Sequence, residues 1–228
     1  MKKIINIFNE WTVIELILLV TTFVLILGSG IIYKSSWITI IASLSGTIYA
    51  LYQARGKVFG QFIGIIEVIL YSYLSYNNQY YGEVLVYVLL ILPLNIAGIF
   101  SWINNKNKKT NRVTQNKISN NEYIFLGIGS LLLFVCIYYL LRYFNTSELL
   151  ISTFSVIIYV VATYLVVRRS KYGFLLYILS DVILILLWGI PILKGNLLLI
   201  PILIEPLILL FNDLYGWLSW NKESKKTN

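Results

Sequence analysis

The stretch Gly98-Ile-Phe-Ser-Trp102 decides the fold of this chain, because a close copy of it, Gly216-Trp-Leu-Ser-Trp220, follows 118 residues later. Each copy lies at the end of an apolar stretch. Self-similarity at a nearly fixed offset indicates two related structural units. Further pairs keep the same order at offsets of 113 or 114 residues: Lys57 and Glu67 against Lys171 and Asp181, and Gly82 against Gly195.

The composition around these motifs is typical of a membrane protein. Of the 228 residues, 58% are hydrophobic and 12% are charged, whereas roughly a quarter of the residues in a soluble domain are charged. In lipid the backbone must satisfy its own hydrogen bonds, so the apolar stretches are expected to be helices. We predict eight spans: 12–33, 36–54, 58–76, 83–103, 122–144, 151–167, 172–193 and 197–220.

Several function classes are excluded by residue type. The chain has no His and one Cys, which excludes a His/Cys metal cage, a Ser-His triad and an internal disulfide. A phosphate-binding Gly-Lys-Ser/Thr loop is absent from the sequence, so no ATP-driven step is expected. We therefore expect no cofactor, no metal and no catalytic residue.

The basic residues set the expected orientation. The net charge is +8, yet Lys and Arg lie in the short breaks between apolar stretches, which argues against a nucleic-acid partner. The breaks on one side of the predicted bundle hold 15 of the 18 basic residues, and those on the other side hold only Lys34, Arg142 and Lys194. By the positive-inside rule, both termini are predicted to be cytoplasmic in a bacterial plasma membrane.

The repeat and the spans together predict a layout of three helices, one linker helix and three helices, preceded by one extra helix. A single linker span between two three-helix units makes the units parallel, an arrangement found in transporters whose substrate site lies near the midplane. The predicted segments are a tail and extra helix at 1–35, a first repeat at 36–103, a basic cytoplasmic loop at 104–121, a linker helix at 122–144, a second repeat at 151–220 and a tail at 221–228.

The residues of this repeat resemble a known family. Tyr81-Gly82-Glu83, Leu92-Pro93-Leu94-Asn95-Ile96-Ala97-Gly98 and Trp102 look like the end of the first repeat of PnuC-type vitamin transporters. The second repeat matches with Asp181, Lys194-Gly195, Tyr215-Gly216 and Trp220. The resemblance covers residues 33–220.

This resemblance implies a fold similar to the SWEET sugar transporters and facilitated diffusion of nicotinamide riboside for NAD biosynthesis. A cytoplasmic kinase would trap the product by phosphorylation. Nicotinamide riboside members tend to carry Gln where this chain has Asn95, whose amide is one methylene shorter. Relatives resembling thiamine, riboflavin and deoxynucleoside carriers therefore remain alternatives. A homo-oligomer is also compatible with the resemblance.

Polar side chains within the spans are the candidate site residues, because ionisable groups in a membrane are costly. Carboxylates beside aromatic planes suit a hydroxylated sugar with a flat cationic ring. Helical spacing places Glu67 and Tyr71 on one face of the span 58–76. It places Tyr177, Asp181 and Trp188 on one face of the span 172–193. The candidate substrate-binding residues are Glu67, Tyr71, Asn95, Tyr177, Asp181, Trp188, Glu205 and Asn212.

Structural roles are the alternatives for several of these residues. Glu67 and Asp181 could instead form interhelical hydrogen bonds, and Asp213 could be solvated near the cytoplasmic end. Trp102 and Trp220 are expected to be anchors at the membrane interface. Pro93, Pro201 and Pro206 are candidate hinges.

Two other function classes remain open at this point. An intramembrane aspartyl protease needs two Asp in a Gly-containing context that Glu67 and Asp181 lack. A membrane scaffold or sensor would bind a ligand without carrying it across.

Overall fold

The computed structural model describes residues 11–227 and is all-helical over that range. Lys2 and Lys3 of the predicted N-terminal tail, and Asn228, lie outside the described residues. The segments α5, η1 and α6 form one continuous span from Tyr81 to Asn104. The elements are α2 (Val13–Ile32), α3 (Trp37–Ala54), α4 (Phe59–Asn77), α5 (Tyr81–Val86), η1 (Tyr87–Ile91), α6 (Leu92–Asn104), α7 (Asn120–Tyr143), α8 (Leu149–Val167), α9 (Tyr172–Leu193), η2 (Leu197–Leu199) and α10 (Ile200–Thr227).

Side chains at the helix starts explain where several elements begin. Thr12 and Glu15 form a capping box at α2, in which each side chain pairs with the other's backbone N–H. Ser36 caps α3 and Ser119 caps α7 in the same way, by accepting a backbone N–H three residues on. Such caps satisfy amide groups that a helix leaves unpaired at its first turn.

Seven helical segments of the described residues are long and apolar enough to cross a membrane. The one predicted span that is not among them is 36–54, which is α3. Its 18 residues include buried Thr39, Ser43, Thr47 and Gln53. These polar groups are tolerated because α3 packs against α2, α4 and α10 and keeps them away from lipid. The interior position of α3 therefore allows a polarity that a lipid-facing helix would not carry.

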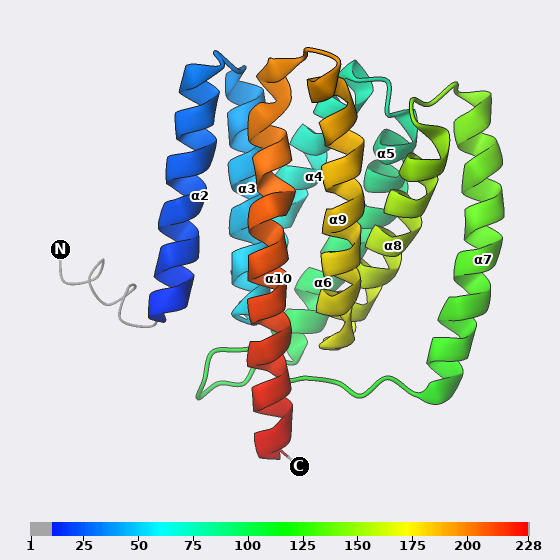
Figure 1. Cartoon of the computed structure of the whole chain (residues 1–228). Helices are drawn as coiled ribbons and strands as arrows, with labels where there is room; N and C mark the ends of the chain where they lie inside the picture. The colour runs from blue at the N-terminus through cyan, green and yellow to red at the C-terminus, as the bar shows by residue number, and fades with distance from the viewer. Residues whose placement is uncertain (1–10, 228) are drawn as a thin grey trace.

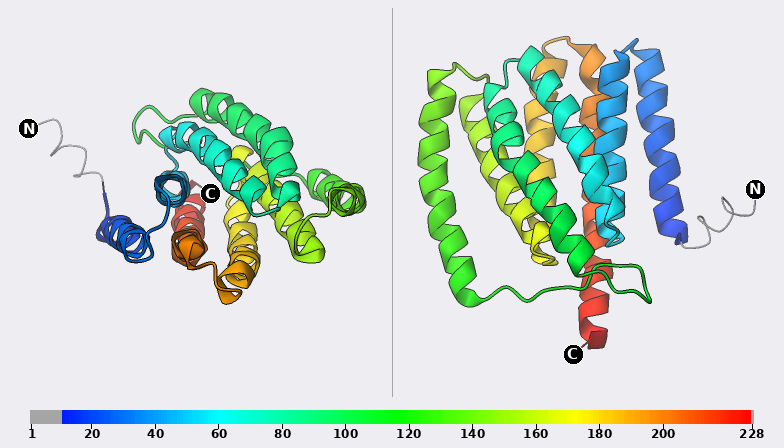
Figure 2. Two further views of the ribbon diagram at one scale, coloured as in Figure 1. Left: turned by 90° about the horizontal axis from the view of Figure 1, so that it is seen from above. Right: turned by 180° about the vertical axis from the view of Figure 1, so that it is seen from behind.

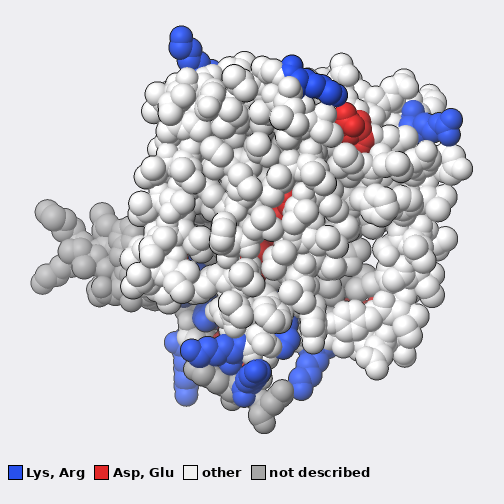
Figure 3. All heavy atoms as spheres, viewed as in Figure 1, with Lys and Arg blue, Asp and Glu red and all other residues white. Residues whose placement is uncertain are grey.

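The helices stand side by side as one bundle, with α2 and α7 at opposite edges (Figures 1 and 2). The turn between α3 and α4, the loop 105–119, the turn between α8 and α9 and the C-terminus lie at one end, which we call the basic end (Figure 1). Figure 3 shows Lys and Arg gathered at this end, with fewer at the opposite end. The membrane-facing middle is largely apolar, as the composition predicted.

Equivalent contacts link the two predicted repeats at the basic end. The Trp102 indole N–H of α6 donates to the Val166 carbonyl of α8 over 3.1 Å. The Trp220 indole N–H of α10 donates to the Ala54 carbonyl of α3 over 3.0 Å. In each case the last helix of one unit bonds to the end of the first helix of the other. Two reciprocal hydrogen bonds of this kind are expected when two parallel units pack around a shared axis.

Glycines show the same correspondence within each unit. A Cβ on Gly60 would lie 3.1 Å from the Tyr49 carbonyl oxygen, and one on Gly173 would lie 2.9 Å from that of Ala162. Both members of the second pair follow those of the first by 113 residues. The division into two repeats stays a prediction, and these matched contacts support it.

Three expectations about the basic end need correction. Trp102 and Trp220 are 0% and 1% exposed. They are therefore buried residues that hydrogen-bond to neighbouring helices, and not anchors at the membrane interface. Most of the predicted tail 221–228 continues α10, which ends at Thr227. The third concerns the loop: the sequence predicted only a basic segment, whereas in the structure it packs on both units, with Val113 N–H donating to the Gly56 carbonyl and Asn116 N–H to that of Arg169.

Candidate functional site

A narrow cavity lies in the interior of the bundle, between the two predicted repeats. Its walls come from α3, α4, η1, α8, α9 and α10, and none of its lining residues belongs to α2 or α7. The cavity has a volume of about 30 Å³, which is room for little more than one water molecule. A vitamin-sized ligand would therefore need these walls to separate. The lining residues are Gly46, Tyr49, Ala50, Gln53, Glu67, Tyr71, Tyr87, Tyr159, Tyr177, Asp181, Leu184, Trp188, Ile202, Glu205, Pro206, Leu209 and Asp213.

Aromatic rings form one wall of the cavity. Tyr71 and Tyr87 are stacked with their ring centroids 4.5 Å apart, and Tyr87 stacks in turn on Tyr159 at 5.2 Å. The Trp188 indole N–H donates to the Tyr71 hydroxyl over 2.7 Å. At the far end of the series, Tyr159 contacts Tyr177 at 5.4 Å. The wall offers flat π surfaces to a planar ring, and cations are attracted to such surfaces.

Four carboxylic acids project into the same space. Glu67 of α4 and Glu205 of α10 meet beside Gly46, where a Cβ would overlap the Glu205 carboxyl group and lie 3.4 Å from Glu67 Cγ. Asp181 of α9 and Asp213 of α10 also line this cavity. All four side chains are buried. Among the residues that the structure describes, no Lys or Arg lines this cavity.

Some polar atoms in the cavity wall lack a hydrogen-bond partner within residues 11–227. They are Gln53 Nε2, Glu67 Oε2 and Asp181 Oδ2. Buried polar groups are normally paired, and an unpaired one costs about 1–3 kcal/mol. These atoms offer one donor and two acceptors to whatever enters the cavity.

Six of the eight predicted site residues lie around this cavity. They come from α4, α9 and α10, and the first and last of them, Glu67 and Glu205, are 138 residues apart in the sequence. The sequence pattern located them from polarity within a span and from helical spacing. The six are Glu67, Tyr71, Tyr177, Asp181, Trp188 and Glu205.

Asn95 and Asn212 do not line the cavity, contrary to expectation. Asn95 is fully buried and accepts a hydrogen bond of 2.9 Å from the Tyr49 hydroxyl, which stands between it and the cavity. Asn212 donates to the Asp213 carboxylate over 3.1 Å. Both amides therefore orient residues of the wall. Asp213, for which solvation was one alternative, is 3% exposed and lines the cavity where we expected Asn212.

The sequence analysis missed Tyr49, Gln53, Tyr87 and Tyr159. Tyrosine is common throughout the chain, with 18 copies, so residue type alone did not distinguish these positions. The backbone gives a clearer signal at Tyr87, which begins the π-helical turn η1. Such turns occur often at functional sites because the wider turn redirects side chains. The nearby Pro93 is the sequence feature that could have pointed to an irregular helix here.

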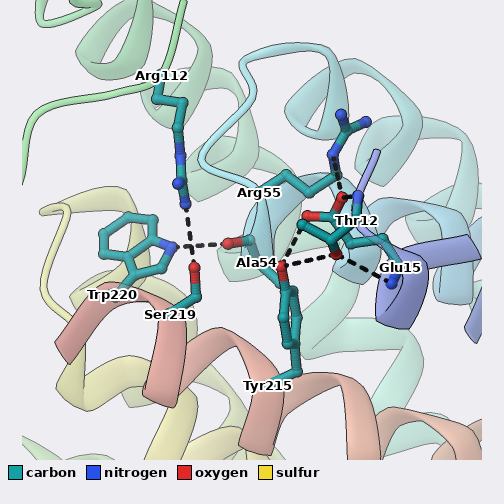
Figure 4. A network of polar contacts seen from close by, with 8 residues as sticks. All are labelled: Thr12, Glu15, Ala54, Arg55, Arg112, Tyr215, Ser219 and Trp220. Carbon is teal, nitrogen blue, oxygen red and sulfur yellow. Dashed lines mark hydrogen bonds and ion pairs between the residues drawn. The ribbon is translucent and has the colours of Figure 1, made fainter. Parts of the chain in front are cut away.

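A second polar cluster ties α2 to the bundle at the basic end (Figure 4). The Glu15 carboxylate lies 3.4 Å from Arg55 Nε and accepts a 2.9 Å hydrogen bond from the Tyr215 hydroxyl. The Arg55 guanidinium also lies 3.9 Å from the centre of the Trp11 ring. In the same view, Arg112 of the loop donates to the Ser219 hydroxyl, close to the bond between Trp220 and Ala54. These contacts join α2, α3, α10 and the loop at the basic end.

Comparisons with known proteins agree with this arrangement. Residues 36–222 match the family model described as nicotinamide mononucleotide transporter. A nicotinamide riboside transporter PnuC of Neisseria mucosa is 22% identical over 97% of this chain and 86% of its own length. The nicotinamide riboside transporter PnuC of Haemophilus influenzae is 23% identical over 96% of this chain and 95% of its own length.

The fold has a solved counterpart. The crystal structure of the vitamin B3 transporter PnuC superposes with a TM-score of 0.84 at 22% identity, covering 96% of this chain and 94% of that one. The likeness shows the same all-helical, multi-pass membrane architecture. Since the family model spans the larger part of the sequence, this chain belongs to the nicotinamide mononucleotide transporter family, the family of the PnuC vitamin transporters.

Proposed function

We propose that this protein carries nicotinamide riboside across a bacterial plasma membrane. The observation that supports this most strongly is the cavity itself, which combines stacked tyrosines with buried carboxylates and lies between the two predicted repeats. Nicotinamide riboside is a cationic aromatic ring joined to a sugar. The ring suits the aromatic wall through stacking and cation–π attraction, and the hydroxyls suit the carboxylates. The names of the two curated relatives point to the same substrate.

Alternating access is the mechanism that we propose for this transport. The cavity is too narrow for the substrate as it stands, so the helices around it must separate toward one end at a time. Pro206 lines the cavity inside α10, and Pro93 is the second residue of α6, which directly follows η1. Both residues leave helix carbonyls without their usual donor, which makes bending at these points less costly.

Uptake is expected to be facilitative and to be drawn forward by phosphorylation of the product in the cytoplasm. The positive-inside rule places the basic end, and with it both termini, in the cytoplasm. The substrate would then enter from the opposite end and leave past the loop 105–119. Thiamine, riboflavin and deoxynucleosides are the competing substrates, because each also offers a flat ring to the tyrosine wall.

Transport by purified protein in liposomes tests this proposal. Labelled nicotinamide riboside should enter in a saturable manner and be competed by the unlabelled compound alone. Glu67→Gln should reduce entry, whereas Glu223→Gln, at the basic end of α10, should not. Entry of thiamine, riboflavin or a deoxynucleoside in its place would contradict the substrate assignment. Binding without entry of any compound would favour a sensor or scaffold.

A further inference from the structure

We propose that a groove beside α7 binds an anionic phospholipid of the membrane leaflet at the basic end. The phosphate would lie at the turn between α8 and α9, and an acyl chain would lie between α7 and α9. None of the residues that line this groove also lines the central cavity. The inference is therefore independent of which substrate the protein carries.

The polar half of the groove lies at the basic end. It is a pocket of about 640 Å³ between the loop 105–119, the start of α7, the turn between α8 and α9, and Ser224 of α10. Its charged residues are Lys117 and Lys171, and no Asp or Glu of the described chain lines it. Asn116 and Asn120 add neutral amides to the lining. Ammonium groups with neutral donors beside them form a site for a phosphate group.

Lys171 is positioned in this pocket by neutral partners. Its Nζ donates to Asn221 Oδ1 over 2.6 Å and to Ser224 Oγ over 3.2 Å. Neither acceptor carries a charge, so these bonds orient the ammonium group without neutralising it. An ammonium group has three protons to donate, and the two bonds leave the third for an anion in the pocket.

The apolar half continues from the pocket along the membrane-spanning part of α7. It is a groove of about 520 Å³ between α7, α8 and α9, and none of its lining residues is charged. Leu126, Leu165 and Leu175 are among them. Gly127 of α7 keeps the groove open, because a Cβ there would have no atom within 4 Å. This space suits a flexible hydrocarbon chain.

Two tyrosines join the polar half to the apolar half. Tyr123 of α7 and Tyr172 of α9 line both the pocket and the groove. Their rings meet edge to face, with centroids 6.3 Å apart. Tyrosine is enriched at the level of lipid headgroups, where its ring faces hydrocarbon and its hydroxyl faces water. The two halves therefore meet where a phospholipid changes from headgroup to acyl chain.

A second groove, on the side of α7 that faces α6, provides an internal comparison. It has a volume of about 500 Å³ and lies between η1, α6, α7 and α8. A Cβ on Gly129, which lines it, would also have no atom within 4 Å. None of the residues that line this second groove is charged. An acyl chain fits there too, but its lining does not select an anionic headgroup.

Native mass spectrometry of the full-length protein in micelles with added lipid tests the headgroup site. The probes are phosphatidylglycerol, which is anionic, and phosphatidylethanolamine with the same acyl chains, which has no net charge. We expect phosphatidylglycerol to bind with a Kd at least about tenfold lower, because each nearby Lys favours an anionic lipid. Lys117→Gln and Lys171→Gln should each raise that Kd about fivefold. Lys108→Gln, outside the pocket, is the control and should not raise it.

Phenylalanine substitutions on α7 test the acyl-chain groove. Gly127→Phe should raise the Kd for phosphatidylglycerol about tenfold, which is the effect of two methylene groups losing their apolar contact. Gly129→Phe, which instead fills the groove facing α6, should leave that Kd unchanged. Equal losses from the two variants, or equal Kd values for the two lipids, would overturn the inference.

The same spectra distinguish a phospholipid from other occupants. Glycerol 3-phosphate carries the anionic phosphate without acyl chains and should not displace the lipid. If it binds as tightly as phosphatidylglycerol, the pocket takes a soluble anion and the inference is wrong. The inference also fails if Gly127→Phe separates copies of an oligomer while the lipid stays bound, because the groove is then a contact between copies.

Discussion

At the scale of single residues, Trp188 has the most specific contact in the cavity wall. Its indole N–H holds the Tyr71 hydroxyl, and Tyr71 in turn stacks on Tyr87. Trp188→Phe keeps a ring of similar position but removes this donor, which is worth about 1 kcal/mol. We expect the KM for transport to rise about fivefold with little change in the maximal rate.

Trp217→Phe provides the comparison for that measurement. Trp217 is on α10, one of the helices around the cavity, but it does not line the cavity, and its indole Nε1 has no partner among the described residues. Uptake by this variant should match the wild type. Equal losses in both variants would mean that indole substitution affects folding and not the substrate.

The prediction from sequence failed at two adjacent residues of α10, because it placed Asn212 in the cavity wall where the structure places Asp213. The α10 residues in the wall are Ile202, Glu205, Pro206, Leu209 and Asp213. This spacing forms a stripe in which Glu205 lies at one edge, so a residue seven positions later falls outside it. Reasoning outward from Glu205 alone therefore selected Asn212. Including the apolar members Ile202 and Leu209 would have selected Asp213.

At the scale of elements, the glycines between paired helices determine how closely those helices pack. A Cβ on Gly173 would meet Val166 Cγ2 at 2.5 Å as well as backbone atoms of α8. Gly173→Ala should therefore lower the free energy of unfolding by about 1–3 kcal/mol, the usual cost of overpacking. Gly60→Ala should act similarly between α4 and α3. Thermal unfolding in detergent measures both.

Gly127→Ala is the control for the glycine substitutions, because a Cβ at Gly127 of α7 would have no atom within 4 Å. There the higher helix propensity of alanine should leave stability unchanged or raise it slightly. Destabilisation by Gly127→Ala equal to that of Gly173→Ala would show that close packing is not the cause.

The attachment of α2 depends on the buried pair of Glu15 and Arg55, whose side chains are 6% and 5% exposed. Glu15→Gln leaves the Arg55 charge without its carboxylate and should destabilise the protein by about 3 kcal/mol. The partly exposed pair of Arg112 and Glu223 at 3.6 Å offers a contrast, and Glu223→Gln should cost less than about 1 kcal/mol. Similar melting temperatures for the two variants would contradict this ranking.

At the scale of the whole molecule, the proposed orientation can be measured with single cysteines. Cys136 is exposed on α7, so Cys136→Ser gives a background without thiols. In that background Lys194→Cys should react with a membrane-impermeant maleimide in intact cells. Lys108→Cys should react only after the cells are permeabilised. The reverse pattern would place the basic end outside.

The sequence predicted most of the architecture and less of the site's interior. Apolar length located the spans, and the copied Gly-x-x-Ser-Trp motif indicated the repeat. Pro93 could have pointed to the irregular turn η1, but not to which side chain it directs into the cavity. The burial of Trp102 could not be predicted, because it depends on a contact with Val166 of the other unit. The narrowness of the cavity has the same origin, since it depends on how the rings of five helical segments interlock.

The polarity of α3 has a consequence for how the protein is made. The translocon releases a helix into lipid according to its apolarity, and α3 is the one predicted span that fails that criterion within the described chain. Its partners α4 and α10 are synthesised later, the last of them about 150 residues later. During biogenesis α3 must therefore stay in contact with α2 or with the insertion machinery until α10 has been synthesised. Ribosome-bound chains in which a polar linker long enough to clear the exit tunnel follows Arg55 should fail to integrate α3, whereas full-length chains should integrate it.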